Sequence, residues 1–305
     1  MSEQKILRFY LEDSLRQSAQ AGTHNFIRQV STVAKSAGLE VEYHGDSLAD
    51  RAASMARDGY ALFHMQEPTT PNGMTFRRVY HYPFWAIEPT GKRWDWRVAK
   101  TRFDADEIDP NKAKTFFERW QKHLFHDAPK QTMHDGFIYV PLQGRLLERR
   151  SFQLCSPVEM ILSVLQHDPN RQVIATLHPG EQYSREEQKR LEQLQSRFSH
   201  LTIRSGGMVE LLHSCDYVVT QNSAAAFNGF FFQKPCVLFA KSDFHHISAS
   251  VGHVGVAAAF DMVRRMQPDY ARYLFWFWQM MSINAGRKEA ETKIATALRR
   301  AGWPI

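Results

Sequence analysis

The sequence predicts an α/β protein with two Rossmann-like domains. Apolar strand patterns alternate with helical patterns over residues 6–65, and the alternation starts again at residue 137. Such alternation is typical of parallel sheets covered by helices. At 305 residues the chain also exceeds the usual size of a single domain. We therefore expect an N-terminal domain over 1–135 and a C-terminal domain over 136–305, because residues 130–135 are polar and break the periodicity.

The first half predicts a β-α-β-α-β order. Strands are expected at 6–10, 39–43 and 60–65, and helices at 26–37 and 49–57, each helix ending near a glycine. The stretch 67–110 is rich in aromatic residues and has no clear period, which fits either a sugar-stacking wall or the core of an irregular segment. An amphipathic helix is expected at 111–125.

The second half begins with a strand at 137–140. Ser156, followed by Pro157 and Glu159, predicts a helix start, and Ser184 with Glu187 repeats that capping box. Further strands are expected at 173–177, 201–204, 218–221 and 235–239, with a short helix at 208–213 and helices from about 269 onward. Two such halves followed by helices describe the GT-B architecture, in which two Rossmann-like domains face a central cleft that holds the ligand.

Two of these strands end in polar residues. His178 and Pro179 follow one strand, and Asn222 and Ser223 follow another just before a helix. The free amide groups and the dipole of a helix start favour a phosphate group. An imidazole and a hydroxyl at two strand ends suit a sugar nucleotide, although each motif alone also fits an ordinary turn or a capping serine.

The charge pattern favours an acidic partner. The formal net charge is +6 and the isoelectric point is about 9.2. Nucleotides, anionic glycans or an anionic membrane surface are therefore plausible partners. The basic residues are dispersed, without the Lys/Arg-rich tail of a dedicated nucleic-acid-binding protein, so we expect no nucleic acid.

The cysteines and apolar segments predict a cytoplasmic protein. The three cysteines are isolated in the sequence, which argues against a disulfide framework. Residues 1–5 lack the apolar run of a signal peptide. The most apolar stretch, at 273–281, is too short to span a bilayer, so we expect a core or interdomain helix. Peripheral contact with the inner membrane remains open.

Several short motifs in the second half occur in a recognisable order: Val140-Pro141-Leu142-Gln143, Ser156-Pro157, His178-Pro179, Asn222-Ser223 and Gln233-Lys234-Pro235-Cys236-Val237. This order resembles the bacterial capsular polysaccharide biosynthesis family, whose best-known members look like retaining Kdo transferases that use the cytidine monophosphate ester of Kdo. The resemblance covers roughly residues 137–300, including the aromatic segment at 273–276. The N-terminal half is similar in architecture only.

The resemblance implies a set of donor-binding residues: Gln143, His178, Pro179, Asn222 and Ser223. In the family an Asp commonly follows the Gln by about four positions and is a catalytic carboxylate. Position 147 of this sequence is Leu, and the nearest carboxylate is Glu148, which lies among three arginines. Glu148 is therefore the candidate nucleophile or stabilising carboxylate, and its alternative role is a surface ion pair.

A general base for the acceptor hydroxyl is expected from the first half. Glu67 is the first candidate because it follows the strand at 60–65, and His81 and Glu88 come next. We expect no metal and no cofactor, because the monophosphate leaving group that the resemblance implies carries less charge than a diphosphate and does not require a divalent metal. The Asp104-Ala105-Asp106 sequence resembles a metal-binding D-x-D motif but lies in a charged loop.

The sequence thus predicts a cytoplasmic, metal-independent glycosyltransferase of bacterial surface polysaccharide synthesis. Its partners would be a nucleotide-activated acidic sugar, such as Kdo, and a glycan or glycolipid acceptor. Two alternatives stay open. One is a transferase that uses a nucleotide-diphosphate sugar, with Arg204 or Lys234 on the second phosphate. The other is a non-catalytic glycan-binding or assembly protein. Leu147, at the position of the family's Asp, is the feature that supports this alternative.

Overall fold

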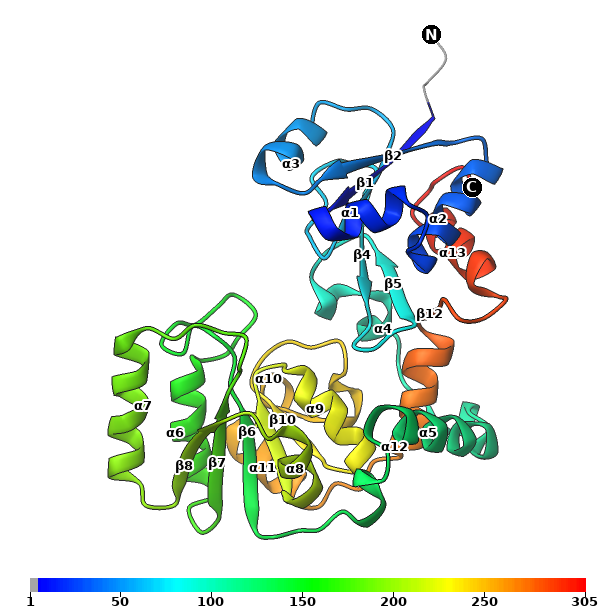
Figure 1. Ribbon diagram of the computed structural model, residues 1–305. Coiled ribbons are helices and arrows are strands. Elements are labelled where there is room, and N and C mark those ends of the chain that lie inside the picture. Colours follow the sequence, from blue (N-terminus) through cyan, green and yellow to red (C-terminus); the bar gives the residue numbers. More distant parts are fainter. Residues whose placement is uncertain (1–4) are drawn as a thin grey trace. The chain divides into compact units, whose positions relative to one another are not determined.

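The computed structural model describes residues 5–305 and divides into two compact units (Figure 1). Unit 1 comprises the chain up to Thr101 together with Trp276–Ile305, and unit 2 comprises Arg102–Phe275. Each unit contains a six-stranded sheet with helices packed against it. The predicted two-domain α/β architecture is confirmed. Residues 1–4, which entered the signal-peptide argument, lie outside the described part of the chain.

Unit 1 holds a mixed sheet with the strand order β12-β5-β4-β3-β1-β2. The strands are β1 (Ile6–Leu11), β2 (Glu40–Gly45), β3 (Tyr60–His64), β4 (Gly73–Arg78), β5 (Phe84–Glu88) and β12 (Ile283–Asn284). The first four strands of the chain run parallel, whereas β5 is antiparallel to β4 and β12 is antiparallel to β5. The two antiparallel pairings therefore lie at one edge of the sheet.

The helices of unit 1 come from both ends of the chain: α1 (Asp13–Gln20), α2 (Asn25–Ser36), α3 (Leu48–Ser54), α4 (Arg97–Lys100) and α13 (Ala290–Arg300). Helices α2 and α13 contribute buried residues to one core with the sheet. Phe26 and Val30 of α2 and Ile294 and Leu298 of α13 pack with Phe76 in that core. Their helical spacing turns one apolar stripe of each helix inward.

Unit 2 holds a parallel sheet with the order β11-β10-β9-β6-β7-β8. The strands are β6 (Phe137–Pro141), β7 (Gln172–Leu177), β8 (Leu201–Ser205), β9 (Tyr217–Thr220), β10 (Cys236–Leu238) and β11 (Ala249–Ser250). The central strands β6 and β9 are buried along their whole length. This explains their continuous apolar runs, because helices cover both faces of a parallel sheet.

The helices of unit 2 are α5 (Pro110–Phe125), α6 (Pro157–His167), α7 (Arg185–Arg197), α8 (Met208–Ser214), α9 (Ala224–Gly229), α10 (Val251–Val254), α11 (Val256–Val263) and α12 (Tyr270–Leu274). Both predicted capping boxes are present, at Ser156 with Glu159 and at Ser184 with Glu187. Helices α6, α7 and α11 share one core with the sheet.

Short helical turns complete the chain. They are 3₁₀ turns at Arg93–Asp95, Ala105–Glu107, Ala128–Gln131, Phe230–Phe232 and His245–Ile247, and a π-helix at Phe275–Met280. The π-helix is the apolar stretch in which the sequence predicted a core or interdomain helix. The boundary between the two units falls inside it. Within the described residues, the structure has no helix whose length and apolar character would let it cross a bilayer.

The structure corrects the predicted boundary at 135. Residues 102–135 belong to unit 2, because α5 packs on other parts of that unit: the rings of Phe117 and Phe231 stack with centroids 5.6 Å apart. Residues 276–305 belong to unit 1, because β12 pairs with β5 and α13 buries its apolar stripe there. Both assignments depend on long-range contacts that the local sequence pattern does not contain.

The stretch 67–110 is also more regular than the sequence suggested. It contains β4 and β5, which pair with each other in antiparallel register from Thr75 and Glu88 to Arg78 and Trp85. All five residues of β5 are buried, so its sequence lacks the polar alternation of a half-exposed strand. Phe76, Phe84, Trp85 and Trp96 of this stretch are core residues, whereas Tyr82 is 52% exposed.

Candidate functional site

The chain order of unit 2 places a topological switch point between β6 and β9. From β6 the chain runs to β7 and β8 on one side, and then returns to β9 on the other side of β6. Ligands of open α/β sheets bind at the carboxyl edge beside such a point. Gln143 follows β6, His178 follows β7, and Asn222 with Ser223 follows β9. The structure therefore brings these predicted donor-binding residues to one edge of one sheet.

Two glutamines at this edge carry buried acceptor atoms without a partner. Oε1 of Gln143 and Oε1 of Gln221 accept no hydrogen bond within the described residues. The Gln221 side chain is buried and its Nε2 donates to the Cys155 carbonyl at 3.0 Å, which fixes its orientation. Buried polar atoms normally have partners, so both atoms are suited to accept from a ligand. Sequence reasoning missed Gln221, although it lies beside Asn222 at the strand end.

The His178 ring is exposed and held in one tautomer. Its Nδ1 accepts a hydrogen bond from the Gly180 amide at 3.1 Å, while the His178 amide donates to the Tyr183 hydroxyl at 2.8 Å. Because Nδ1 is the acceptor, the neutral ring carries its proton on Nε2. The turn through Pro179 and Gly180 thus leaves an N–H donor available to an anion.

Asn222 and Ser223 hold the start of α9. Asn222 Nδ2 donates to the Lys241 carbonyl at 3.0 Å, and Ser223 Oγ accepts from the Ala225 amide at 3.2 Å as the N-cap. Helix α9 has only six residues, so its dipole is much weaker than the sequence argument assumed. The Ser223 hydroxyl can still donate its own proton, because accepting the amide uses only a lone pair.

The candidate carboxylate Glu148 lies in the exposed loop after β6. Its Oε2 is 3.5 Å from Arg145 NH1, and both side chains are about two-thirds exposed. Leu147 is 37% exposed and offers no polar group. A second carboxylate, Glu181, follows the His178 turn and contacts Gly144 so closely that no side chain could replace that glycine without a shift. Sequence reasoning missed Glu181, and its position just after a strand-end histidine was the available signal.

Arg150 is the cation beside this loop. Its Nε and one NH2 group are buried without a hydrogen-bond partner, and its guanidinium lies over the Phe152 ring at 4.9 Å. Burial lowers the pKa of Arg150, the nearby Arg145 lowers it further, and the charges of Glu181 and Glu148 oppose that shift. The loops at the carboxyl edge therefore hold a cation, hydrogen-bond donors and two carboxylates, of which Glu181 lies beside Gly144.

In unit 1, Glu67 is not where the sequence argument placed it. Its carboxylate accepts hydrogen bonds from Thr90 Oγ1 at 2.9 Å and from the Gly91 amide at 2.7 Å. Thr90 and Gly91 follow β5, which is antiparallel to its neighbour β4, so these bonds tie Glu67 to the turn after β5. The residues after β3 turn away from the strand end and return to begin β4, which the strand pattern alone could not show.

His81 and Glu88 lie at opposite ends of β5. His81 is in the turn between β4 and β5, where its ring meets Trp278 edge to face at 5.7 Å. Glu88 is the last residue of β5; it is 9% exposed and accepts from the Arg97 amide at 3.2 Å. Burial raises the pKa of Glu88. The structure therefore does not bring the three acceptor-side candidates together at one strand edge.

The switch point of unit 1 instead lies between β1 and β3. Glu12 directly follows β1, and His64 ends β3. Burial lowers the pKa of His64 to about 4, and the charge of Glu12 opposes this shift. The Glu12 side chain is exposed and accepts a hydrogen bond from Ser14 Oγ at 3.1 Å. Sequence reasoning missed Glu12, although it immediately follows the first predicted strand.

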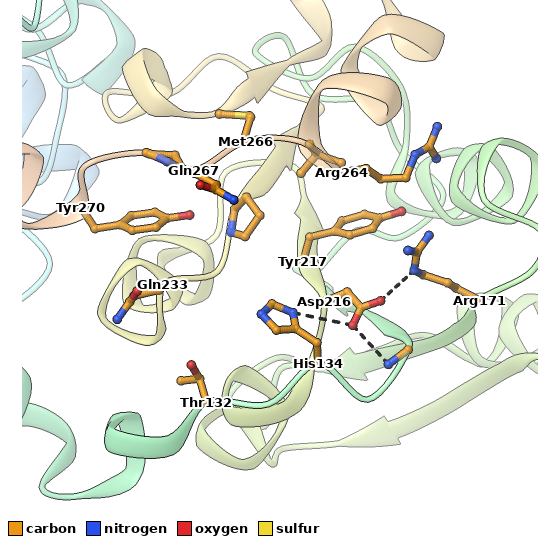
Figure 2. Close-up of a pocket in the computed structure, with 14 residues that line it drawn as sticks. Thr132, His134, Arg171, Asp216, Tyr217, Gln233, Arg264, Met266, Gln267 and Tyr270 are labelled. Atoms are coloured by element: carbon orange, nitrogen blue, oxygen red, sulfur yellow. Dashed lines mark hydrogen bonds and ion pairs between the residues drawn. The ribbon is translucent and has the colours of Figure 1, made fainter.

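A cavity of about 620 Å³ lies at the amino edge of the unit 2 sheet (Figure 2). Its charged groups are paired with one another. Asp216 bonds to Arg171 Nε at 2.7 Å and lies 3.8 Å from His134, as Figure 2 shows. The buried Asp168 accepts from Arg171 and from the Tyr217 hydroxyl, each at 2.7 Å. This cavity is at the opposite edge from the predicted donor-binding residues. Its charged network is paired internally, whereas the buried Tyr270 hydroxyl in its lining has no partner within the described residues.

Within the described residues, no three side chains of the His, Cys, Asp or Glu type converge as a metal would require. The D-x-D sequence caps a 3₁₀ turn, since Asp104 Oδ1 accepts the Asp106 amide at 3.1 Å. The motif therefore has a local structural role.

No protein-family model matches the sequence, and no curated protein matches it significantly. Among solved structures, the chain is similar to KpsC of Thermosulfurimonas dismutans, a beta Kdo 2,7 transferase, with a TM-score of 0.56 and 13% identity over 98% of this chain and 100% of that chain. It is also similar to the beta Kdo 2,4 transferase of KpsC from that organism, with a TM-score of 0.48 and 10% identity over 90% of each chain. The first likeness supports the fold, a two-domain α/β architecture of the GT-B type.

Proposed function

We propose that the chain is a glycosyltransferase of bacterial surface polysaccharide synthesis. It transfers an acidic sugar, such as Kdo, from its cytidine monophosphate ester to a glycan or glycolipid acceptor at the cytoplasmic side of the inner membrane. The observation that carries this proposal is the convergence of Gln143, His178 and Ser223 after neighbouring strands at the switch point of unit 2. The GT-B-type fold supports it, because that fold uses this edge for its donor.

The donor's phosphate would bind between His178 and Ser223. Cleavage of the glycosyl–phosphate bond develops negative charge on the leaving phosphate, which hydrogen-bond donors must stabilise. His178 Nε2–H and the Ser223 hydroxyl supply two such donors, and Arg150 adds a positive charge with unpaired N–H groups. The buried Oε1 atoms of Gln143 and Gln221 would accept hydroxyl protons of the donor.

A carboxylate is needed near the anomeric carbon, where oxocarbenium character develops. We assign this role to Glu148, the carboxylate nearest to the position of the family's Asp. Its exposure and its weak pairing with Arg145 leave it able to contact a bound sugar. Glu181 is the alternative carboxylate, because it packs against Gly144 in the same loop region.

Unit 1 would bind the acceptor and supply the general base. Glu67, His81 and Glu88 remain the proposed candidates, and Glu12 joins them because it follows β1 at the switch point. Glu12 is exposed and bonds only to a serine hydroxyl within the described residues, whereas Glu67 already holds the turn at Gly91. We therefore rank Glu12 first for testing.

The experiment is a binding and turnover panel on the purified chain. Calorimetry would compare cytidine monophosphate with uridine diphosphate, and donor hydrolysis would be measured with the cytidine monophosphate ester of Kdo. We expect cytidine monophosphate to bind more tightly and the ester to be hydrolysed slowly without acceptor. Preferential binding of uridine diphosphate would contradict the donor class and favour the nucleotide-diphosphate alternative.

One observation favours a second function, a non-catalytic glycan-binding or assembly protein. Leu147 stands where the resembled family commonly has its catalytic Asp, and Glu148 is exposed. Nucleotide binding without any hydrolysis or transfer, across acceptors that support related enzymes, would favour this second function.

A further inference from the structure

A cavity of about 240 Å³ in unit 1 has an excess of positive charge. Its walls come from β5, α4, the segment around Met281 and α13. Three basic side chains line it, Arg97, Lys293 and Arg300, and the only acidic side chain in the lining is Glu88. The amino-edge cavity of unit 2 is different, because its arginines have carboxylate partners.

Two of the basic groups are fixed in place by carbonyl oxygens. Arg97 donates to the Met281 carbonyl at 2.9 Å, and Lys293 Nζ donates to the carbonyls of Gln279 at 2.6 Å and Ser282 at 3.0 Å. These bonds position the two cations but do not neutralise them. Arg300, at the exposed end of α13, makes no ion pair within the described residues.

The electrostatics of the cavity are unfavourable without a ligand. Burial lowers the pKa of Arg97 and of Lys293, and repulsion from Arg300 and Arg97, respectively, lowers each further. The charges of Glu88 and Glu289, respectively, oppose these shifts. Burial also raises the pKa of Glu88, which weakens its value as a counter-ion. The Nε1 of Trp85, another lining residue, is a buried donor without a partner. The cavity thus offers donors and positive charge but only one acid.

We propose that this cavity binds the phosphate group of a small ligand. Arg97 comes from α4, and Lys293 and Arg300 come from α13, so three cations of two helices line one cavity. The several oxygens of a phosphate can accept from all three. Helix packing alone accounts for Arg97 and Lys293 as carbonyl partners, but it does not account for Arg300 or for Trp85 Nε1. The proposal concerns unit 1 and does not depend on the donor site of unit 2.

The test is calorimetric titration of the full chain with inorganic phosphate at constant ionic strength. We expect saturable binding, weakened about tenfold by Arg300→Gln, as loss of one charge-assisted hydrogen bond implies. Arg299→Gln is the matched control, because it removes the same charge from the neighbouring position of α13 outside the cavity lining. Binding that is absent in the wild type, or weakened equally by both variants, would overturn the proposal.

Two further probes separate the sources of the phosphate. Glycerol 3-phosphate represents a dissolved ester, and vesicles containing phosphatidylglycerol represent a lipid headgroup. Binding of the ester that depends on Arg300 supports a dissolved ligand. Vesicle binding that is lost in Arg300→Gln but kept in Arg299→Gln supports a headgroup. If neither probe binds in an Arg300-dependent way, the proposal fails even where inorganic phosphate binds.

Discussion

The two edges of the unit 2 sheet differ in how their charged side chains are paired, although each edge also holds buried polar atoms without a partner, among them the Tyr270 hydroxyl at the amino edge. At the amino edge, Asp168, Arg171 and Asp216 satisfy one another through short bonds. At the carboxyl edge, buried atoms of Gln143, Gln221 and Arg150 have no partner within the described residues. Both edges belong to the same six strands, so the contrast does not come from the fold itself.

The contrast separates groups that stabilise the unit from groups that await a ligand. A buried charge must be paired or it strongly destabilises the fold, and the amino edge obeys that rule. An unpaired buried polar atom is unfavourable until a ligand or an ordered water supplies the missing bond. The carboxyl edge, which also lies beside the switch point, is therefore the better candidate for binding, although the cavity of unit 2 described above lies at the other edge.

The largest effect is expected from Glu148→Gln. The amide keeps the shape of the side chain but removes its charge, so transfer should be abolished while donor binding is preserved. Turnover and calorimetry on the same preparation would measure both. Glu181→Gln is the matched variant in the same loop region. If Glu181→Gln abolishes turnover and Glu148→Gln does not, the catalytic carboxylate is Glu181; near-normal turnover in both would contradict a retaining mechanism at this edge.

The second prediction tests the paired edge. Asp168→Ala should lower the free energy of unfolding by about 3 kcal/mol, because it removes the buried acceptor shared by Arg171 NH1 and the Tyr217 hydroxyl, although Arg171 Nε keeps its bond to Asp216. Urea unfolding would measure the loss. Asp261→Ala is the control: its carboxylate also pairs with an arginine but is mostly exposed, so the loss should stay below about 1 kcal/mol. If a folded Asp168→Ala protein binds nucleotide more weakly, the assignment of stabilisation to the amino edge and of binding to the carboxyl edge is contradicted.

The third prediction tests the unpaired edge. His178→Ala should weaken binding of cytidine monophosphate by roughly 1.5–3 kcal/mol, the value of one charge-assisted hydrogen bond, with little change in stability. His134→Ala removes an exposed histidine from the amino edge of the same sheet and should leave binding unchanged. Calorimetric titration of both variants checks the comparison, and equal binding by both would remove His178 from the donor site.

The sequence predicted much of unit 2 because its signals are local. The capping boxes at Ser156 and Ser184 and the strand ends at His178 and Asn222 depend on neighbouring residues alone, and the structure places them where expected. The sheet order, which brings β6 beside β9, decides that Gln143 and Ser223 share an edge. That order came from the expected architecture and not from any pattern within a single strand.

Unit 1 was predicted less well because its distinctive features are long-range. The pairing of β12 with β5 joins residues about 200 positions apart, and α13 completes a core begun by α2. The carboxylate of Glu67 binds the amide of Gly91, a contact invisible in a strand pattern. The unit 1 cavity likewise brings Arg97 beside Lys293 and Arg300, which are far from it in the sequence. Neither the charge count nor the spacing of these residues indicates the cavity.

The smallest effect is expected from Ser223→Ala, and it needs the most careful control. Ser223 caps α9, so the variant should lose about 1 kcal/mol of stability whether or not a donor binds. Ser184→Ala removes an N-cap serine from α7. This serine forms a capping box with Glu187, so the loss of stability in unit 2 should be similar or larger. Because both variants remove an N-cap serine from a helix of unit 2, weaker binding of cytidine monophosphate by Ser223→Ala than by Ser184→Ala indicates the donor role of the Ser223 hydroxyl. We expect weaker binding by Ser223→Ala alone; equal binding at equal stability would leave Ser223 with a purely structural function.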